Sequence, residues 1–395
     1  MGKPSSSARK ESSFKRLMTF ICADHRYVFL GTCVVALGAL ALLGVKPSSS
    51  SFLAALPVLQ GIIVAVCAAW LAVSAVALVY KLTHWRTYGT VAPFVQPRAK
   101  LIERVGSYVV WLAALVVIAD RVVVSMVDVT AASIALDRNP QGFIPSAIYM
   151  TWEARDIFLR GIETTVELAI FGTIIAFFLA LLLVFLRIQT PDRSDNDFVR
   201  FLKTIGNGFA RLYSTVVRGT PMMVQGVVIY YAGFNLFRAL GMNVSQTQAI
   251  WSFFIAGLVT ISLCSAAYMA EVLRASIEAI DPGQTEAARS LGLSQWQAMR
   301  KIVFPQGVKN AIPAISNEFI INIKDSSVLS VIGVFDLMYA TTSVAGIYFK
   351  QMELYVVAAL AYLCLTLIAG KILNFLSARL GMGTRNVLST EKEQR

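Results

Sequence analysis

The stretch Ile280–Gln306, IDPGQTEAARSLGLSQWQAMRKIVFPQ, is polar in a chain that is otherwise strongly apolar. Its first half predicts a capped helix, with Asp281 as N-cap and Pro282 at the first helical position. Gln284 is placed to reach back to the cap, as in a capping box. Gly292 suits the left-handed residue that ends such a helix. The sequence therefore predicts one short helix that stops at a glycine.

The second half of the stretch predicts another short helix. Ser294 and Gln297 have the spacing of a second capping box, and Pro305 marks the expected end. Each helix carries a small apolar stripe, made of Ala287, Ala288 and Leu291 in the first and of Trp296, Met299 and Val303 in the second. A rigid surface of this kind suits the docking of a partner. An amphipathic hairpin lying on lipid fits the same pattern.

The composition indicates a membrane protein. Of 395 residues, 56% are hydrophobic and only 15% charged, and the mean hydropathy is +0.65. The formal charge of +12 fits basic cytoplasmic loops better than nucleic-acid binding, because the basic residues lie between apolar runs. The cysteines have no close-spaced pair, and His25 and His84 have no partner at ligand spacing. We therefore expect no disulfide framework and no metal site.

Apolar runs of about 20 residues predict membrane-spanning helices. Eight runs qualify, which are Tyr27–Val45, Phe52–Tyr80, Val105–Val127, Thr164–Leu186, Pro221–Leu240, Ala249–Ala270, Ala311–Val334 and Met352–Gly370. With the N-terminus inside, the cytoplasmic segments hold 27 Lys and Arg residues and the external segments five. This bias predicts an all-α polytopic protein with both termini in the cytoplasm.

The spans and loops divide the chain into five parts. These are a cytoplasmic tail (1–26), an accessory three-helix region (27–127), a periplasmic connection (128–155), a five-helix domain (156–380) with its cytoplasmic loop (280–306), and a cytoplasmic tail (381–395). Within the third span, Asp120 and Arg121 are expected to pair with each other. The sequence has no convincing internal repeat, so it gives no support to an inverted-repeat secondary transporter.

The polar loop also carries a known motif. Glu286–Ala288, then Gly292, Ile302 and Phe304–Pro305 resemble the EAA loop of ABC importer permeases, E-A-A-x3-G-x9-I-x-L-P, with Phe304 in place of the usual Leu. The resemblance implies the type I importer permease fold, with about eight helices here, three accessory and five core. It also implies that this loop is the coupling helix, which inserts into a groove on an ATP-binding subunit.

Three further stretches narrow the resemblance to polar amino acid permeases, the His/Glu/Gln/Arg/opine family. They are Val217–Gln225 (VRGTPMMVQ), Ala267–Arg274 (AYMAEVLR) and Ile323–Leu329 (IKDSSVL), the last departing from the family's IKDTSL at Ser326 and Val328. With its long N-terminal extension, the chain is most similar to the M-type permease of general L-amino acid transporters. Residues 1–150 contribute no motif.

The resemblance implies several partners in a bacterial inner membrane. These are a related permease chain that forms the other half of the pore, two ATP-binding subunits and a periplasmic amino-acid-binding protein, besides membrane lipid. The chain itself has no GxxxxGK[ST] phosphate loop. We therefore expect a non-catalytic subunit without a cofactor, in which ATP and Mg are bound by the partner ATPase.

Two sets of residues are candidates for function. The coupling set is Gly283, Glu286, Ala287, Ala288, Leu291, Gly292, Trp296 and Pro305. The set for the substrate path or gate is Gln225, Glu271, Lys324, Asp325, Ser326 and Ser327, because ionisable groups within a span are costly and usually functional. A structural ion pair of Lys324 with Glu271 or Glu318 is the alternative for that lysine. Arg218 and Pro221 are expected at the membrane edge, the arginine at the headgroups and the proline at the first helical position.

Three other interpretations of the sequence remain open. One is a membrane scaffold that has lost its transport role, and the intact Lys324, Asp325 and Gln225 argue against it. An ion-coupled secondary transporter or channel would need no ATPase, and the coupling loop argues against it. An ABC permease for a different small solute is opposed only by the RGTP and KDSS stretches.

Overall fold

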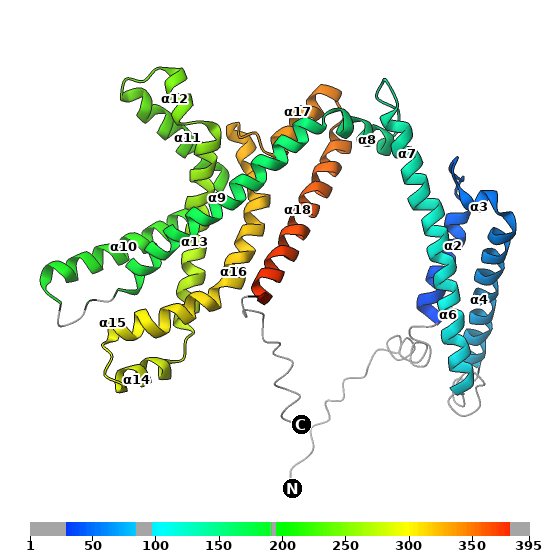
Figure 1. Ribbon diagram of the computed structural model, residues 1–395, viewed down its shortest axis with the longest axis horizontal. Coiled ribbons are helices and arrows are strands. Elements are labelled where there is room, and N and C mark those ends of the chain that lie inside the picture. Colours follow the sequence, from blue (N-terminus) through cyan, green and yellow to red (C-terminus); the bar gives the residue numbers. More distant parts are fainter. Residues whose placement is uncertain (1–28, 84–96, 190, 192–194, 380–395) are drawn as a thin grey trace, which may run out of the picture. The chain divides into compact units, whose positions relative to one another are not determined.

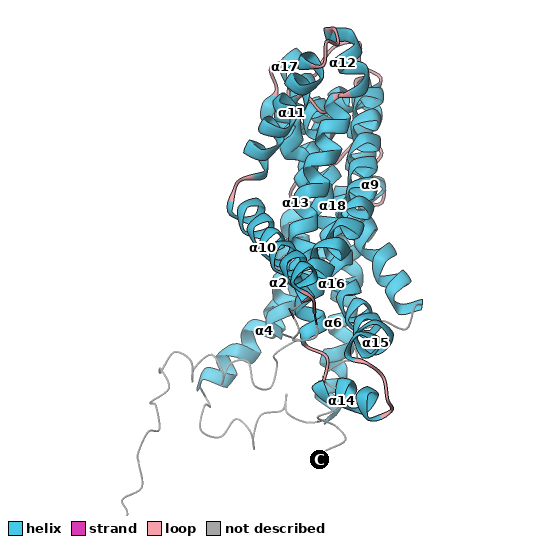
Figure 2. Cartoon of the chain, turned by 90° about the vertical axis from the view of Figure 1, so that its left-hand side faces the viewer, coloured by secondary structure: helices cyan, strands magenta, loops and turns pink. Residues whose placement is uncertain are grey.

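The computed structural model describes residues 29–83, 97–189, 191 and 195–379. In this part of the chain the regular structure is helical, and no strand occurs (Figure 2). The two predicted tails, Cys22, His25 and His84 lie outside the described residues. The chain divides into two compact units, Met1–Pro140 and Gln141–Arg395.

The first unit is built from three long helical stretches. Its elements are α2 (Phe29–Leu43), α3 (Phe52–Ala55), α4 (Pro57–Thr83), α6 (Pro97–Ile118), the π-helical turn η2 (Ala119–Val124) and α7 (Ser125–Ile134). Small and β-branched side chains from α2, α4 and α6 form its core, including Ala36, Cys67 and Val117. A buried hydrogen bond of 2.8 Å between the Thr32 and Ser107 hydroxyls joins α2 to α6.

The π-helical turn contains the predicted Asp120–Arg121 pair. The two side chains are buried, and Arg121 Nε lies 3.4 Å from Asp120 Oδ2. The carboxylate is also held from the start of α3, because it accepts hydrogen bonds from the Ser51 hydroxyl (2.8 Å) and the Leu53 amide (3.1 Å). The pair is therefore structural, as predicted, and it also fixes the connection between α2 and α4.

The second unit contains the remaining helices. They are α8 (Phe143–Glu153), α9 (Arg155–Ile188), α10 (Asp197–Gly219), α11 (Met222–Ala239), α12 (Val244–Ile250), α13 (Phe253–Glu278), α14 (Pro282–Ser290), α15 (Gln295–Ala298), the π-turn η3 (Met299–Val303), α16 (Phe304–Asp325), the 3₁₀ turn η4 (Ser326–Ile332), α17 (Leu337–Tyr348) and α18 (Gln351–Arg379). Figure 1 shows α9 running across α13 and α16. At the lower end of this unit lie α14 and α15.

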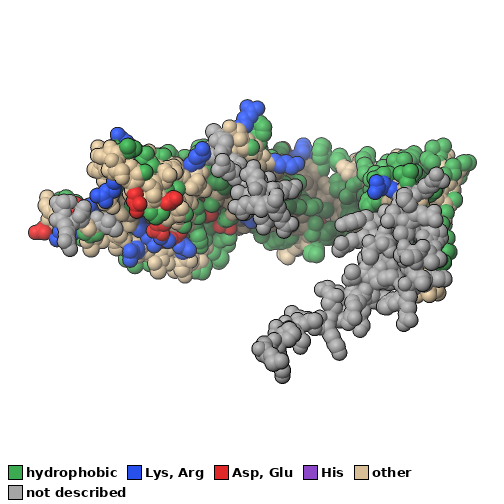
Figure 3. Space-filling model, turned by 90° about the horizontal axis from the view of Figure 1, so that it is seen from below, with side chains coloured by type: hydrophobic (Ala, Val, Ile, Leu, Met, Phe, Trp, Pro, Cys, Tyr) green, Lys and Arg blue, Asp and Glu red, His purple; other side chains and the backbone are tan. Residues whose placement is uncertain are grey.

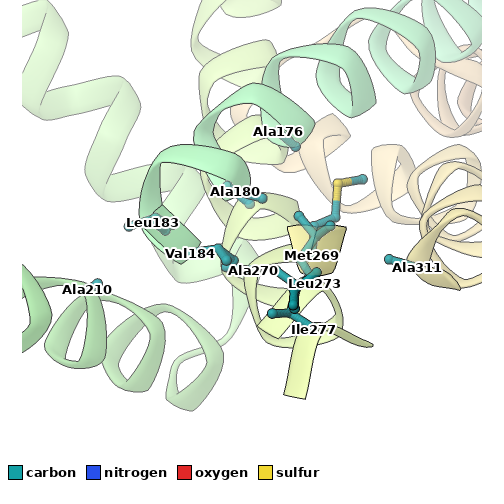
Figure 4. Close-up of a cluster of buried hydrophobic side chains, with 12 residues drawn as sticks. Ala176, Ala180, Leu183, Val184, Ala210, Met269, Ala270, Leu273, Ile277 and Ala311 are labelled. Carbon is teal, nitrogen blue, oxygen red and sulfur yellow. The ribbon is translucent and has the colours of Figure 1, made fainter. Parts of the chain in front are cut away.

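Small residues let α9 and α13 approach closely. A Cβ atom added at Gly172 of α9 would lie 2.4 Å from Ile261 Cγ2 of α13. Small side chains on facing positions are typical of helix crossings in membranes, where close backbone approach supplies the packing energy. Nearer to α14, the buried cluster in Figure 4 joins Ala176 and Ala180 of α9 to Leu273 and Ile277 of α13. The bundle is therefore closely packed at the end that carries the polar loop.

Among the described residues, fewer helices have the length and hydropathy expected of a span than the eight predicted runs. Five described stretches are long and apolar enough to cross a bilayer, namely Pro57–Tyr80, Leu101–Ile134, Arg155–Ile188, Phe253–Glu278 and Gln351–Arg379. A sixth is the pair Gln295–Ile332 and Leu337–Tyr348, which bend by 52° at their junction. The predicted first span begins outside the described residues, and its described part is α2, with 15 helical residues. The predicted fifth span is α11, whose 18 residues include Gln225, Asn235 and Arg238.

Candidate functional site

The helix α14 begins as a capped helix but without the predicted capping box. The Asp281 carboxylate accepts a hydrogen bond from the Gly283 amide at 2.8 Å, and Pro282 is the first helical residue. The Gln284 side-chain oxygen Oε1 instead accepts from the side-chain nitrogen Nε2 of Gln306, near the start of α16, at 3.4 Å. The capping-box prediction for Gln284 is therefore wrong, because this side chain joins α14 to α16.

A glycine ends α14, as predicted. Gly292 has a φ of 87°, which is strained for residues with a side chain. Its amide donates to the Arg289 carbonyl at 2.9 Å, and the Leu293 amide donates to the Ala288 carbonyl at 3.2 Å. These two bonds form a Schellman motif, which satisfies the carbonyls at the helix end. The turn after α14 is therefore fixed by its backbone.

The second helix starts with the predicted capping box. The Ser294 hydroxyl accepts from the Gln297 amide at 3.2 Å, and the Ser294 amide donates to Gln297 Oε1 at 2.9 Å. The prediction that Pro305 ends this helix is wrong, since α15 runs through η3 into α16. Proline lacks an amide hydrogen, and its ring crowds the preceding turn of a helix. The preceding turn here is the π turn Met299–Val303, which is wider than an α-helical turn and leaves room for the ring. Any displacement of α15 is therefore passed directly to α16.

The exposed side chains of Asp281–Pro305, hereafter the α14 segment, include most of the predicted coupling set. Gly283, Glu286, Ala287, Leu291, Gly292, Trp296 and Pro305 are exposed, Leu291 to 84%. The prediction that Ala287, Ala288 and Leu291 share one face needs a correction. Ala288 is buried and packs inside the segment, since it lies about 100° around the helix from its neighbour. Figure 3 views the molecule from this side and shows Lys, Arg, Asp and Glu side chains over this part of the second unit.

The α14 segment is anchored to the bundle by apolar contacts. A Cβ atom added at Gly307 would lie 2.5 Å from Ile277 Cγ1 and 2.9 Å from Ile277 Cα, so α16 and α13 touch there. Trp296 packs edge-on against Phe185 of α9, with 6.0 Å between ring centroids. Val303 is buried in the cluster that contains Ile277. The segment is therefore exposed outward and tightly packed inward.

A charged cluster lies at the ends of α9, α10 and α13. The Glu271 carboxylate of α13 is bonded to Arg187 of α9, lies 3.5 Å from Nη1 of Arg218 of α10, and lies 3.1 Å from Nη2 of Arg274. Arg274 also pairs with Glu278. The alternative that Glu271 pairs with Lys324 is wrong, since these partners are all arginines. One carboxylate thus joins the ends of α9 and α10 to α13.

The prediction for Arg218 is refined by its surroundings. Besides the contact with Glu271, its guanidinium stacks over the Tyr268 ring at 5.5 Å. The side chain is 42% exposed, so it also remains accessible from outside the bundle. Pro221 lies one position earlier than predicted, as the N-cap of α11, because the helix begins at Met222.

Gln225 holds the turn between α10 and α11. Its amide nitrogen contacts the Val217 carbonyl (2.7 Å) and both the carbonyl (3.0 Å) and the hydroxyl (2.7 Å) of Thr220. Its oxygen accepts from the Cys264 thiol at 2.9 Å. The two donor hydrogens of the amide are therefore engaged, and its oxygen accepts one hydrogen bond and keeps a second lone pair.

The Lys324–Ser327 patch, hereafter the KDSS patch, lies where α16 ends. Lys324 is exposed, Asp325 is half-buried, and Ser326 is fully buried. The Ser326 and Ser327 hydroxyls donate to the carbonyls of residues three positions earlier, at 2.9 and 2.6 Å. Among the described residues, no carboxylate lies within 4.0 Å of the Lys324 nitrogen, so the alternative pairing with Glu318 is not formed. The patch therefore presents one exposed cation beside a half-buried acid.

Comparison with known proteins gives a consistent result. Residues 198–382 match the family described as "Binding-protein-dependent transport system inner membrane component". The arginine transport system permease protein ArtQ of Bacillus subtilis is 35% identical over 210 residues, which are 53% of this chain and 86% of that protein. The glutamine transport system permease protein GlnP of Escherichia coli is 31% identical over 229 residues, 58% of this chain and 95% of that protein. The chain belongs to this permease family.

A solved structure is similar over the same extent. A chain from the crystal structure of an amino acid ABC transporter with histidines is 33% identical, covers 57% of this permease and 95% of its own length, and gives a TM-score of 0.48.

The permease also contains two buried polar groups that the sequence reasoning missed. Asn322 of α16 bonds the Ser265 hydroxyl of α13 (2.6 Å) and the Thr173 hydroxyl of α9 (2.9 Å), just before the KDSS patch. The signal in the sequence was the amide side chain of Asn322 within an apolar run, since such a group needs a hydrogen-bond partner inside the bundle. These two hydrogen bonds join α16 to α13 and to α9, in a region where lipid chains offer no hydrogen-bonding partner.

The second missed group is Asp336, which lies between η4 and α17. Its carboxylate caps α17 by accepting from the Tyr339 amide at 2.9 Å, and the Tyr362 hydroxyl of α18 lies 3.3 Å away. The Leu337 amide donates to the Thr165 hydroxyl of α9 at 3.1 Å. An aspartate just before an apolar run is an N-cap signal that the sequence does contain. These bonds hold the bend that follows the KDSS patch.

Proposed function

We propose that this permease is a subunit of an ATP-driven, binding-protein-dependent importer of polar L-amino acids, in which it forms half of the translocation pore. Its family membership and its relatives named for arginine and glutamine transport support this. It is a multi-pass inner-membrane protein and a non-catalytic subunit. ATP and Mg are bound by two separate ATP-binding subunits.

The α14 segment is the proposed docking site for the ATP-binding subunit. The observation that carries the proposal is its geometry, an exposed helix with a fixed glycine turn whose continuation is α16 itself. A displacement imposed on α14 and α15 would reach the KDSS patch through one helix of the bundle. The Lys and Arg bias of 27 to five supports a cytoplasmic location for this segment and for both termini.

The KDSS patch is the proposed element of the substrate path or gate. Lys324 would attract the carboxylate of a zwitterionic amino acid, and Asp325 its ammonium group. The buried Ser326 supports the helix instead of facing the path. We assign Glu271 to joining α9 and α10 to α13, and Gln225 to holding the α10–α11 turn, since the contacts of both side chains lie there.

A related permease chain would complete the pore, and a periplasmic binding protein would deliver the amino acid. An ABC importer of a different small solute is the alternative that the same architecture allows. A panel of amino acids supplied with the binding protein separates the two, since only an amino acid importer has its hydrolysis stimulated by members of that panel. The ion-coupled alternative is disfavoured by the family match.

The docking proposal can be tested with a pair of matched positions. Leu291 and Leu240 are both C-cap residues before a left-handed glycine, and they are 84% and 66% exposed. A photo-crosslinking residue at Leu291 should capture the co-expressed ATP-binding subunit in membranes, and the same residue at Leu240 should not. Capture at both positions or only at Leu240 would contradict the assignment.

A further inference from the structure

The helix α10 has three distinct faces. At 100° per residue, one face of the helix packs against α9 and α13 and includes several small residues. Gly206 touches Leu186 of α9, where an added Cβ atom would lie 3.1 Å from the leucine Cδ2. The Tyr213 hydroxyl donates to the Leu263 carbonyl of α13 at 2.8 Å. Ala210 and Ser214 are buried between these contacts.

The second face of α10 is an exposed apolar stripe. Seven large side chains fall within an arc of about 100° and run the length of the helix. Each is more than half exposed, and they are Phe198, Phe201, Leu202, Ile205, Phe209, Leu212 and Val216. The arc contains no polar residue. Protein interfaces normally mix apolar contacts with hydrogen-bonding groups, so a stripe of this composition matches hydrocarbon better than a protein partner.

The third face of α10 is exposed and polar. Arg200, Thr204, Arg211 and Thr215 share it, and all four are exposed. A helix within the hydrocarbon could not keep two arginines on an exposed face along its length. A helix surrounded by water would not expose seven large apolar side chains. The two exposed faces therefore require an apolar medium on one side and water or headgroups on the other.

We propose that α10 lies along the surface of the bilayer, on the side of the α14 segment, with its apolar stripe among the acyl chains and its arginines at anionic headgroups. A basic polar face opposite a Phe- and Leu-rich face is the pattern of helices that bind in the membrane interface. Figure 1 shows α10 running crosswise to α13, as a surface helix beside a span would.

Lipid contact at α10 has a consequence for the α14 segment, and this step rests on the proposed function. A pocket of about 360 Å³ is lined by Phe185 at the end of α9, by Val199, Leu202 and Gly206 of α10, and by Trp296. The surface helix thus forms one wall of the place where α15 meets the bundle. Lipid that holds α10 in position would keep this wall fixed when the α14 segment is displaced.

Depth measurements test the proposal directly. Single cysteines are introduced in a chain whose five native cysteines have been replaced. They are placed at Phe201, Ile205, Phe209 and Leu212 on the apolar stripe and at Arg200, Thr204, Arg211 and Thr215 on the polar face. Each is spin-labelled in nanodiscs of phosphatidylethanolamine and phosphatidylglycerol, with the full chain alone and with its co-purified partner subunits. The readout is the accessibility of the label to oxygen and to a water-soluble nickel chelate.

The expected result is an alternation along the helix. The ratio of oxygen to nickel accessibility should be several-fold higher at the apolar positions than at the polar ones, in both preparations. Apolar-stripe labels that become immobile and shielded from both reagents with the partner subunits would show a protein interface and overturn the proposal. Equal nickel access on both faces would overturn it as well. Neither outcome depends on ATP hydrolysis, so the docking proposal stands or fails separately.

Discussion

Glu271 and Lys324 are both charged residues of the helical bundle, but their surroundings differ. Glu271 contacts three arginines that come from α9, α10 and α13. Lys324 is exposed and has no carboxylate within ion-pair distance among the described residues. The first joins elements of the permease, and the second remains available to something outside the chain. In a membrane bundle, the role of a charged residue thus depends on which helices surround it and whether they supply an ionic partner.

The largest effect on stability is expected for Glu271→Gln. Removing this carboxylate leaves three arginines close together without their shared partner. Because Glu271 is 20% exposed, the cost should be about 2 kcal/mol, between the values for an exposed and for a buried ion pair. The apparent melting temperature of the purified protein in detergent should fall clearly. Glu278→Gln is the matched control, because that side chain is 61% exposed and pairs only with Arg274. Equal melting temperatures for the two variants would show that Glu271 stabilises the bundle no more than an exposed carboxylate with one partner.

Within the cluster, Arg187 should contribute more to stability than Arg218. Both contact Glu271, but the Arg187 side chain is 20% exposed and that of Arg218 is 42% exposed. Solvent screens the more exposed pair, so Arg218→Met should cost no more than about 1 kcal/mol. Arg187→Met should lower the melting temperature further in the same assay. The reverse order would mean that Arg218 is shielded by lipid or by a partner in the purified particle.

Lys324→Met should have the smallest effect on stability and a large effect on transport. An exposed side chain without an ionic partner should change stability by less than about 0.5 kcal/mol. Uptake of the amino acid in proteoliposomes should nevertheless fall at least tenfold if this cation is in the path, an expectation from the usual role of intramembrane charges. Lys309→Met is the control, being an exposed lysine of α16 outside the KDSS patch. A destabilised variant with normal uptake would contradict this expectation and would mean that Lys324 has a structural role, as Glu271 does.

The local structure of the α14 segment was largely predictable from the sequence. The Asp281 cap, the Gly292 turn and the Ser294 capping box depend on residues within a few positions of each other, and all three are present. The prediction for Pro305 failed because the effect of this proline depends on the width of the preceding turn. A π turn leaves little trace in a single sequence.

Contacts between distant helices were predicted less well. The partners of Glu271 lie 84 and 53 positions earlier in the chain, at Arg187 and Arg218, and nothing in the sequence pairs them. Asn322 was overlooked because the neighbouring charges of the KDSS patch gave the stronger signal. The predicted fifth span is apolar in outline, but α11 is interrupted by polar residues and does not meet the length and hydropathy expected of a span. Pairing across a bundle requires the three-dimensional arrangement.

The most direct test of the central claim compares Gly292→Asp with Gly241→Asp. Both glycines end a helix with a positive φ, 87° and 91°, and a Cβ atom added at either one would meet no atom within 4 Å, so the two substitutions bring similar local strain. The measurement is ligand-stimulated ATP hydrolysis in proteoliposomes that contain the partner permease, the ATP-binding subunits and the binding protein. The account predicts that Gly292→Asp abolishes stimulation and that Gly241→Asp preserves it. Stimulation that survives Gly292→Asp in a fully assembled complex would contradict it.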